Sequence, residues 1–324
     1  MRRTARVSFL AAILVWLSDP SALGPEPLAA QTTGGAPKAV LVTGASSGIG
    51  RRITELLASK GHYVYAGARK DEDMRALDAI PNVEAVRLDV TKQAEIDAAV
   101  ETVRRGGRGL YGVVNNAGVA VIAPMIETVE EDLRFQLDVN VLGPYRITRA
   151  FAPLIIESKG RISTIGSLNA ILAGAFSGPY AMSKFAMEAF TDALVAEMRP
   201  FEVRVSIVHP GRYSSEMSIN VMERMRTKGR SAEGSRYEAQ LERMLANFSV
   251  DESTHADPIE VAEAVEHALF DPNPKVRYLV TPTAGAAHGT VRRALEKAVE
   301  LNERHRHSLE PARLRAMLDS LIAN

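Results

Sequence analysis

The chain has 324 residues and no cysteine, and its 39 basic residues balance 39 acidic ones. The lack of cysteine excludes disulfides, a thiolate nucleophile and cysteine-ligated metals, and the seven histidines do not cluster as metal ligands would, so no metal site is predicted. The length suffices for one large α/β domain or two small ones, and the neutral charge gives no electrostatic reason to expect a nucleic-acid partner.

The first 30 residues have the layout of a secretory signal. Three arginines precede an apolar stretch over residues 7–17, and an alanine-rich segment follows it. The stretch is too short to cross a bilayer as a helix, so no stable transmembrane span is expected. A leader over 1–30, with 31–37 as a linker, predicts export to the periplasm or the cell exterior. The alternative is a misplaced start codon, with translation beginning near Lys38 and the protein in the cytoplasm.

Beyond residue 37, short β-branched runs alternate with helical patterns. This alternation is typical of βαβ units and a parallel sheet, and near-continuous apolar runs indicate strands with helices on both faces. The predicted strands are 39–43, 63–67, 83–88, 112–115, 161–165, 203–209 and 277–281. We therefore predict a single α/β domain over residues 38–285 with a doubly wound parallel sheet, the Rossmann fold.

A glycine-rich turn follows the first predicted strand and precedes a helical pattern. A strand, such a turn and a helix in this order surround a dinucleotide pyrophosphate with backbone N–H groups. Its glycines serve a tight turn, close approach to phosphate and close helix packing. The cofactor contacts predicted here are Thr43, Gly44, Ser46, Ser47, Gly48, Ile49 and Gly50.

The end of the second strand indicates which dinucleotide binds. An acidic residue there would hold the ribose hydroxyls of NAD, but this strand runs into Ala68-Arg69-Lys70 and the acids come only afterwards. A guanidinium can hold a 2′-phosphate through two hydrogen bonds, so Arg69 favours NADP over NAD. The alternative is that Arg69 is a solvated surface arginine.

Polar residues also end the third and fourth strands, at the edge where such sheets bind ligands. The carboxylate of Asp89 could meet the adenine amino group. The asparagines of Asn115-Asn116-Ala117-Gly118 could contact the nucleotide or, equally, stabilise the central sheet. The cofactor contacts predicted at these two strand ends are Asp89, Val90, Asn116, Ala117 and Gly118.

Helical segments account for the rest of the chain. A capping box at 128–131 predicts a long helix towards Glu157, which Gly143-Pro144 and Pro153 are expected to bend or interrupt. The charged, methionine-bearing segment 212–257 occupies the place of a substrate lid. Residues 286–324 form an amphipathic helical extension that is expected to pack on the body or on a neighbouring subunit.

Tyr180 and Lys184 lie four residues apart in a helical pattern, which puts both side chains on one face. Reduction of a carbonyl needs a hydride from one side and a proton from a nearby acid. A free tyrosine has a pKa of about 10, and an ammonium beside its hydroxyl would favour the phenolate. Downstream of a dinucleotide turn, this pair predicts hydride chemistry with Tyr180 as acid/base, whereas alone it could be an ordinary surface pair.

Four motifs in this order resemble the classical short-chain dehydrogenase/reductases. They are TGASSGIG at 43–50, NNAG at 115–118, YAMSK at 180–184 and HPG at 209–211. The similarity covers Lys38 to Thr281. The amino-acid sequence of residues 109–118 and 203–211 is similar to that of the branch of the family that acts on retinoids, steroids and hydroxybutyrate.

The resemblance implies further site residues. The family's serine, thirteen residues before the tyrosine, corresponds to Ser167, which would hydrogen-bond the carbonyl oxygen. The family's helical asparagine corresponds to Asn140, which would hold a helix kink and a water that relays protons to Lys184. His209 stands where the family often has an acid or asparagine. The nicotinamide-side contacts implied are Tyr180, Lys184, Pro210, Gly211 and Ser215, the last in place of the usual threonine.

The predicted function is an NADP-dependent oxidoreductase that interconverts a secondary alcohol and a carbonyl. Its small-molecule substrate is expected to be apolar and steroid-, retinoid- or lipid-like, because no fixed cationic site for a small acid can be located. Arg212 could supply one, which keeps a hydroxy-acid or sugar dehydrogenase as the alternative. A non-catalytic NADP-binding sensor is the alternative from another class. A homo-oligomer is expected because dimers and tetramers are common in the family.

Overall fold

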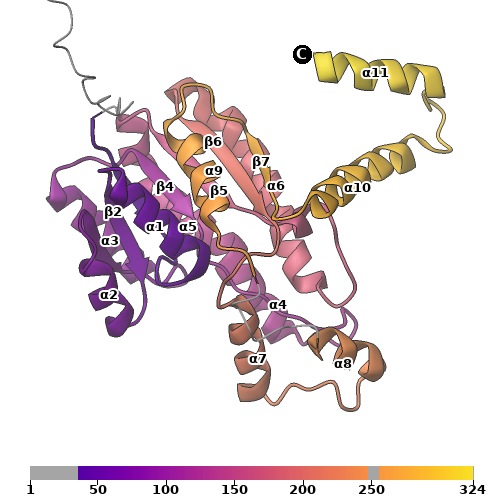
Figure 1. The fold of residues 1–324 in the computed structure, drawn as a ribbon, viewed down its shortest axis with the longest axis horizontal. Helices are drawn as coiled ribbons and strands as arrows, with labels where there is room; N and C mark the ends of the chain where they lie inside the picture. Colours follow the sequence, from indigo (N-terminus) through magenta and orange to yellow (C-terminus); the bar gives the residue numbers. More distant parts are fainter. Residues whose placement is uncertain (1–35, 247–254, 324) are drawn as a thin grey trace, which may run out of the picture. The chain divides into compact units, whose positions relative to one another are not determined.

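The computed structural model describes residues 36–246 and 255–323, so the leader predicted over 1–30 lies outside the described residues. Seven strands form one sheet in the order β3-β2-β1-β4-β5-β6-β7, and every neighbouring pair is parallel (Figure 1). The strands are β1 (Ala39–Val42), β2 (Tyr63–Ala68), β3 (Val83–Arg87), β4 (Gly112–Asn115), β5 (Arg161–Ile165), β6 (Arg204–Pro210) and β7 (Arg277–Val280). All seven agree with the predicted strands to within one residue at each end, which confirms the predicted parallel α/β fold.

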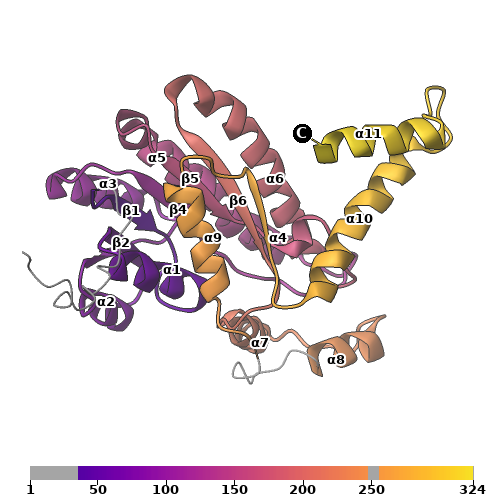
Figure 2. The same cartoon turned by 45° about the horizontal axis from the view of Figure 1, so that its top comes forward.

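Helices pack on both faces of the sheet, as the apolar runs predicted (Figures 1 and 2). In β1, Val40 and Val42 face one side and Ala39 and Leu41 the other, and all four are buried. The first side is covered by α1 (Gly48–Ser59), α2 (Asp71–Asp78) and α9 (Ile259–Phe270), and the second by α3 (Gln93–Gly106), α5 (Gly143–Glu157) and α6 (Gly178–Met198). Alternate side chains of each strand therefore serve two separate apolar cores.

The long helix predicted towards Glu157 is divided by one wide turn. It consists of α4 (Glu130–Leu137), a π-helical segment over Asp138–Leu142, and α5. The predicted capping box is wrong, because the Thr128 hydroxyl donates to the Pro124 carbonyl oxygen at 2.9 Å and the side chain of the N-cap residue Val129 makes no capping bond. The interruption near Gly143-Pro144 is confirmed, whereas Pro153 lies within α5.

Helices outside the sheet layers follow β6 and β7. The segment after β6 contains α7 (Met217–Thr227) and α8 (Glu238–Ala246), and the chain after β7 forms α10 (Ala284–Asn302) and α11 (Pro311–Ala323). The amine of Lys297 on α10 donates to the Ile171 carbonyl oxygen at 2.6 Å and lies 4.4 Å from the centre of the Phe185 ring. No helix within 36–246 or 255–323 is both long enough and apolar enough to cross a membrane.

Candidate active site

The glycine-rich turn lies at the carboxyl end of β1, beside β4, where the strand order of the sheet reverses. Gly44 and Gly48 have φ values of +64° and +53°, in the left-handed region that favours glycine. A Cβ on Gly50 would lie 2.2 Å from the Gly44 carbonyl oxygen and 2.3 Å from Nδ2 of Asn116. The first turn of α1 can approach the end of β1 this closely only because residue 50 has no side chain.

The start of α1 fits a phosphate group. The N-cap residue Ser47 makes no side-chain capping bond, and the first helical turn holds no acidic residue. Its backbone N–H groups and the positive end of the helix dipole therefore suit an anion. Ser46 and Ile49 are half-buried beside Ser47. Ser215 reaches the same turn, because a Cβ on Gly48 would lie 3.0 Å from the Ser215 Cβ.

Thr43 and Asn116 join the ends of β1 and β4. The Thr43 hydroxyl donates to the Val114 carbonyl oxygen at 3.3 Å and accepts from the backbone N–H groups of Asn116 and Ala117, both at 3.0 Å. The Asn116 amide donates to the Thr43 and Gly44 carbonyl oxygens, both at 2.9 Å. These bonds fix the turn, while Gly118 is exposed at its rim.

Arg69 and Asp89 lie at the ends of β2 and β3. Arg69 is exposed, and Asp89 accepts from the backbone N–H and hydroxyl of Thr91 at 2.9 and 2.7 Å. Burial would raise the pKa of Asp89, but the Thr91 hydrogen bonds and the charges of Arg69 and Lys92 bring it below its usual value. Val90 is buried, and a Cβ on Gly143 would lie 2.7 Å from its Cγ2.

Arg87, at the end of β3, is a residue that the sequence reasoning missed. Its guanidinium donates to the Arg69 carbonyl oxygen at 2.6 Å and forms an ion pair with Asp71. The acid two residues after Arg69 is therefore paired with a second cation, which leaves the strand end basic. The sequence signal for this role is that Arg87 is a basic residue at the end of the strand next to β2.

Tyr180 and Ser167 meet at the carboxyl edge of the sheet. Tyr180 lies in the first turn of α6 and Ser167 follows β5. Burial raises the pKa of Tyr180, which is 8% exposed, and hydrogen bonding from the nearby Ser167 hydroxyl offsets part of that rise. A phenol with a raised pKa keeps its proton at neutral pH.

Lys184 is buried beside Tyr180, but its amine is directed elsewhere. Nζ donates to the Ile165 carbonyl oxygen at 2.8 Å and lies 5.6 Å from the centre of the Tyr180 ring. Burial lowers the pKa of Lys184 to about 8. Burial of the phenol raises the pKa of Tyr180 in this structure, and the lowering of that pKa by Lys184 stays a prediction.

Asn140 lies in the π-helical turn and is 2% exposed. Its amide accepts from the Val119 N–H at 2.8 Å and donates to the Val119 carbonyl oxygen at 2.9 Å and to the Ser183 hydroxyl at 3.1 Å. Ser183 in turn donates to the Tyr180 carbonyl oxygen at 2.7 Å. Sequence reasoning missed Ser183, which links the helix kink to the first turn of α6; the water relay through Asn140 stays a prediction.

The end of β6 completes the set of predicted contacts. Pro210 is buried within the strand, and the Gly211 N–H donates to the Val280 carbonyl oxygen at 2.7 Å. The chain then turns towards Ser215, whose hydroxyl accepts from the Met217 N–H at 3.4 Å at the start of α7. This loop carries the chain from the sheet edge across the glycine-rich turn into the helices of 212–257.

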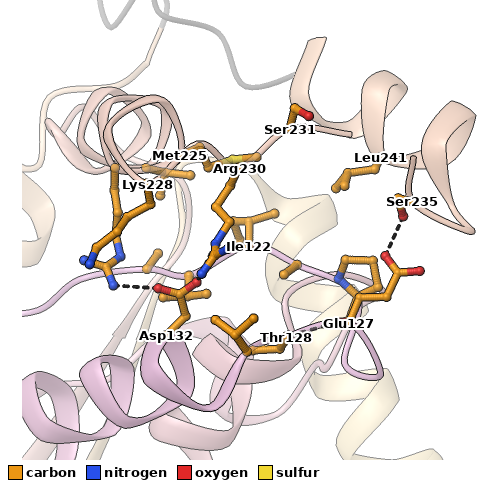
Figure 3. Close-up of a pocket in the computed structure, with 17 residues that line it drawn as sticks. Ile122, Glu127, Thr128, Asp132, Met225, Lys228, Arg230, Ser231, Ser235 and Leu241 are labelled. Atoms are coloured by element: carbon orange, nitrogen blue, oxygen red, sulfur yellow. Dashed lines mark hydrogen bonds and ion pairs between the residues drawn. The ribbon is translucent and has the colours of Figure 1, made fainter. Parts of the chain in front are cut away.

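A cavity of about 120 Å³ lies between the 120–132 segment and the α7–α8 segment (Figure 3). Arg230 reaches across it to Asp132, and Ser235 donates to Glu127 at 2.6 Å. The cavity does not include Tyr180 or Ser167. It adjoins Tyr180 through an apolar cluster that contains this tyrosine and four residues of the cavity wall, namely Ala120, Ile122, Val221 and Leu241.

Comparisons with known proteins agree with this arrangement. The family described as short chain dehydrogenase matches residues 38–226. Mitochondrial D-beta-hydroxybutyrate dehydrogenase of Rattus norvegicus is 34% identical over 262 residues, which cover 74% of this chain and 76% of that protein. Human 17-beta-hydroxysteroid dehydrogenase type 6 is 33% identical over 255 residues, covering 74% and 80%.

A solved structure, a short chain dehydrogenase from Burkholderia cenocepacia in complex with NADP, is also similar. It superposes with a TM-score of 0.62 at 27% identity and covers 81% of this chain and 97% of its own. The strand order and the glycine-rich turn thus occur in a chain whose sequence and fold are similar to those of short-chain dehydrogenases. The chain belongs to the short-chain dehydrogenase family, in the branch of the hydroxybutyrate and hydroxysteroid dehydrogenases, and is an oxidoreductase that acts on hydroxyl groups.

Proposed function

We propose that the protein interconverts a secondary alcohol and a ketone or aldehyde with NADP(H), and that Tyr180 transfers the proton. The proximity of Ser167 to the buried Tyr180, close enough for the serine hydroxyl to lower the pKa of the phenol, carries this proposal. A buried proton donor and a second hydroxyl thus lie at the sheet edge that also holds the glycine-rich turn. A carbonyl oxygen in contact with both hydroxyls would accept two hydrogen bonds as negative charge develops on it.

In the direction of reduction, NADPH held by the glycine-rich turn and Arg69 would supply a hydride to the carbonyl carbon. Tyr180 donates its proton to the carbonyl oxygen, and Ser167 donates a hydrogen bond to the same oxygen. The raised pKa of Tyr180 suits a donor that must hold its proton until that moment. Lys184, with a pKa of about 8, is mostly charged at neutral pH and favours the phenolate that remains. Asn140 holds the helix kink next to this pair.

Arg69 supports NADP as the cofactor. The strand end lacks an acid that would repel a 2′-phosphate, and the nearby Asp71 is paired with Arg87. The related Burkholderia cenocepacia protein was solved with NADP. An exposed guanidinium beside the predicted adenosine site can bind a 2′-phosphate through two hydrogen bonds.

The surroundings of Tyr180 support an apolar substrate. The cluster that contains Tyr180 is formed by apolar residues of the cavity wall. It is covered by further apolar side chains, namely Phe176, Met217, Met225 and Met244. Methionine adapts to irregular apolar ligands. A small hydroxy acid remains the second candidate, because Arg224, Lys228 and Arg230 line the adjoining cavity and a relative is a hydroxybutyrate dehydrogenase. These cations are paired, however, with Asp132 and Glu131, which favours the apolar substrate.

We also propose a homo-oligomer that involves α10. Val291, Leu295 and Val299 form a stripe on this helix at four-residue spacing, and between 44% and 52% of each is exposed. Burial of such a stripe against a second copy would remove apolar surface from water. Light scattering of the parent protein and of a Leu295→Glu variant tests this, because the substitution should lower the observed mass, and an unchanged monomeric mass in both would refute it.

Turnover and cofactor binding of a Tyr180→Phe variant test the main proposal. Purified protein is assayed with NADPH on a panel of apolar ketones and keto acids, and NADPH binding is followed by fluorescence. The variant keeps the ring but loses the proton, so we expect loss of turnover with unchanged NADPH affinity. Ketone reduction at the parent rate would refute the mechanism. An inactive parent that still binds NADPH would favour the cofactor-binding sensor instead.

A further inference from the structure

His209, near the end of β6, lies between the backbone of Ser167 and a carboxylate of α6. It is 2% exposed. Its Nδ1 is 3.3 Å from the Ser167 backbone nitrogen and 3.0 Å from the Ser167 carbonyl oxygen. Its Nε2 is 2.6 Å from Oε1 of Glu188, although the angles of this contact differ from those of a regular hydrogen bond. Both ring nitrogens therefore have close polar neighbours, and one of these is the backbone of a predicted catalytic residue.

Glu188 is itself held in place from the other side. Its second oxygen accepts from Nε of Arg277 on β7 at 2.8 Å, and Arg277 also forms an ion pair with Asp192 at 2.5 Å. Burial would raise the pKa of Glu188, but the hydrogen bonds and charges of His209 and Arg277 bring it below its usual value. The carboxylate is thus ionised at neutral pH and lies 2.6 Å from Nε2 of His209.

The imidazole contacts both polar groups of the Ser167 backbone. Nδ1 lies 3.0 Å from the Ser167 carbonyl oxygen and 3.3 Å from its nitrogen, so the ring can hydrogen-bond this backbone in either tautomer. Gly166 makes room for the ring, because a Cβ there would lie 2.5 Å from Nδ1 of His209. The Gly166 N–H also donates to the Val208 carbonyl oxygen at 2.7 Å, so the residues directly before Ser167 and His209 are bonded to each other.

We propose that His209, oriented by Glu188, is a positioning residue that fixes the Ser167 backbone so that its hydroxyl meets Tyr180. Tyr180 and Glu188 both lie on α6, eight residues apart. The helix that carries the proton donor therefore also carries the carboxylate that orients the imidazole behind Ser167. The inference rests on the proposed roles of Ser167 and Tyr180, because a serine that does not contact the substrate needs no such alignment.

Substitution of His209 by leucine and by asparagine tests the proposal. Leucine removes both nitrogen contacts, whereas asparagine has an oxygen on Cγ, where histidine has Nδ1, and can still accept from the Ser167 N–H. We expect His209→Leu to lower kcat by about tenfold to a hundredfold, the effect of a small misalignment of a reacting group. Its Kd for NADPH should stay at the parent value, and His209→Asn should recover most of the lost kcat.

A histidine–carboxylate pair outside the site supplies the matched control. His267 on α9 lies 3.4 Å from Asp271 through Nε2, and His267→Leu should leave kcat unchanged. Parent-like kcat in His209→Leu would overturn the proposal, as would a loss of kcat that asparagine does not restore. If His209→Leu does not fold, Glu188→Gln takes its place, because it keeps the shape but removes the charge; a parent-like kcat there would also overturn it.

Ser167→Ala distinguishes this inference from the proposed function. If Ser167→Ala turns over at the parent rate, the proposed role of Ser167 is wrong, and the positioning role falls with it. If Ser167→Ala is inactive while His209→Leu keeps the parent kcat, only the positioning role is wrong. If both lose kcat, both bind NADPH like the parent and His209→Asn recovers, both proposals hold.

Discussion

The amine of Lys184 donates a hydrogen bond of 2.8 Å to the carbonyl oxygen of Ile165. Ile165 is the last residue of β5, two residues before Ser167. The bond therefore joins the helix of Tyr180 to the strand that leads to the Ser167 hydroxyl. The amine is buried, and burial lowers its pKa to about 8 from the ordinary value of 10.5. A cation in this position is unfavourable for folding, so its presence points to a functional requirement.

A Lys184→Met variant tests whether the buried Lys184 cation destabilises the folded protein, through the pH dependence of the unfolding free energy. Between about pH 8 and 10.5 the unfolded chain binds the lysine proton more strongly than the folded chain does. The unfolding free energy of the parent should therefore rise with pH relative to that of the variant, by up to about 3 kcal/mol over the whole interval. Urea unfolding of both proteins at several pH values measures the difference between their unfolding free energies. A difference that stayed constant or fell as the pH rose from about 8 to 10.5 would contradict this prediction.

Gly50→Ala should damage the cofactor turn. The added Cβ would lie 2.2 Å from the Gly44 carbonyl oxygen, a backbone atom that cannot easily move. Alanine is the better helix former by roughly 1 kcal/mol, so any loss comes from this contact. We expect a lower Tm and loss of NADPH binding. Gly285→Ala on α10 is the matched control, because its Cβ would meet nothing within 4 Å; equal losses in both variants would contradict the steric explanation.

The strands and the glycine-rich turn were predictable because each depends on local sequence. Runs such as Ala39–Val42 are apolar at every position, which suits a strand covered on both faces. The spacing of the three glycines and the four-residue step from Tyr180 to Lys184 likewise need no knowledge of distant contacts. This information was enough to name the candidate site residues along the chain.

The partners of these residues were not predictable, because they come from other elements. Thr128 had the sequence of a capping residue, but its hydroxyl is used by Pro124. The direction of the Lys184 amine depends on a strand carbonyl nineteen residues away. Arg87 reaches Arg69 only because β2 and β3 are neighbours in the sheet. Spacing along a helix fixes the face of a side chain, but tertiary structure decides which atom it contacts.

Arg69→Asp should reverse the cofactor preference. The substitution removes a charged hydrogen-bond donor for the 2′-phosphate, worth roughly 1.5–3 kcal/mol, so NADPH affinity should fall at least about tenfold. NADH affinity should change little or improve, because an acid at this strand end can hold ribose hydroxyls. Fluorescence titration with both cofactors measures the two Kd values. Arg75→Asp on α2 makes the same charge change at another exposed position; equal weakening of both cofactors by Arg69→Asp would contradict the assignment.

Asp132→Asn should loosen the contact between the α7–α8 segment and the body. Asp132 is 7% exposed in the first turn of α4 and binds Arg224 at 2.7 Å and Arg230 at 3.2 Å. An amide cannot neutralise two guanidinium groups, and hydrogen bonds between charged partners are worth roughly 1.5–3 kcal/mol. We therefore expect faster limited proteolysis within residues 217–246 and a higher KM for an apolar ketone, with little change in NADPH affinity.

Glu131→Gln is the control for this variant. Glu131 pairs with Lys228 at 2.6 Å between the same two segments, but 65% of its side chain is exposed. An ion pair in solvent contributes little to stability, so this variant should keep the parent KM and proteolysis rate. The two acids are adjacent on α4 and differ mainly in burial. A difference in KM or proteolysis rate between the variants is therefore due to the burial of Asp132 and not to its place in the helix. If Asp132→Asn kept the parent KM and resisted protease like Glu131→Gln, the two arginines would not hold the segment in place.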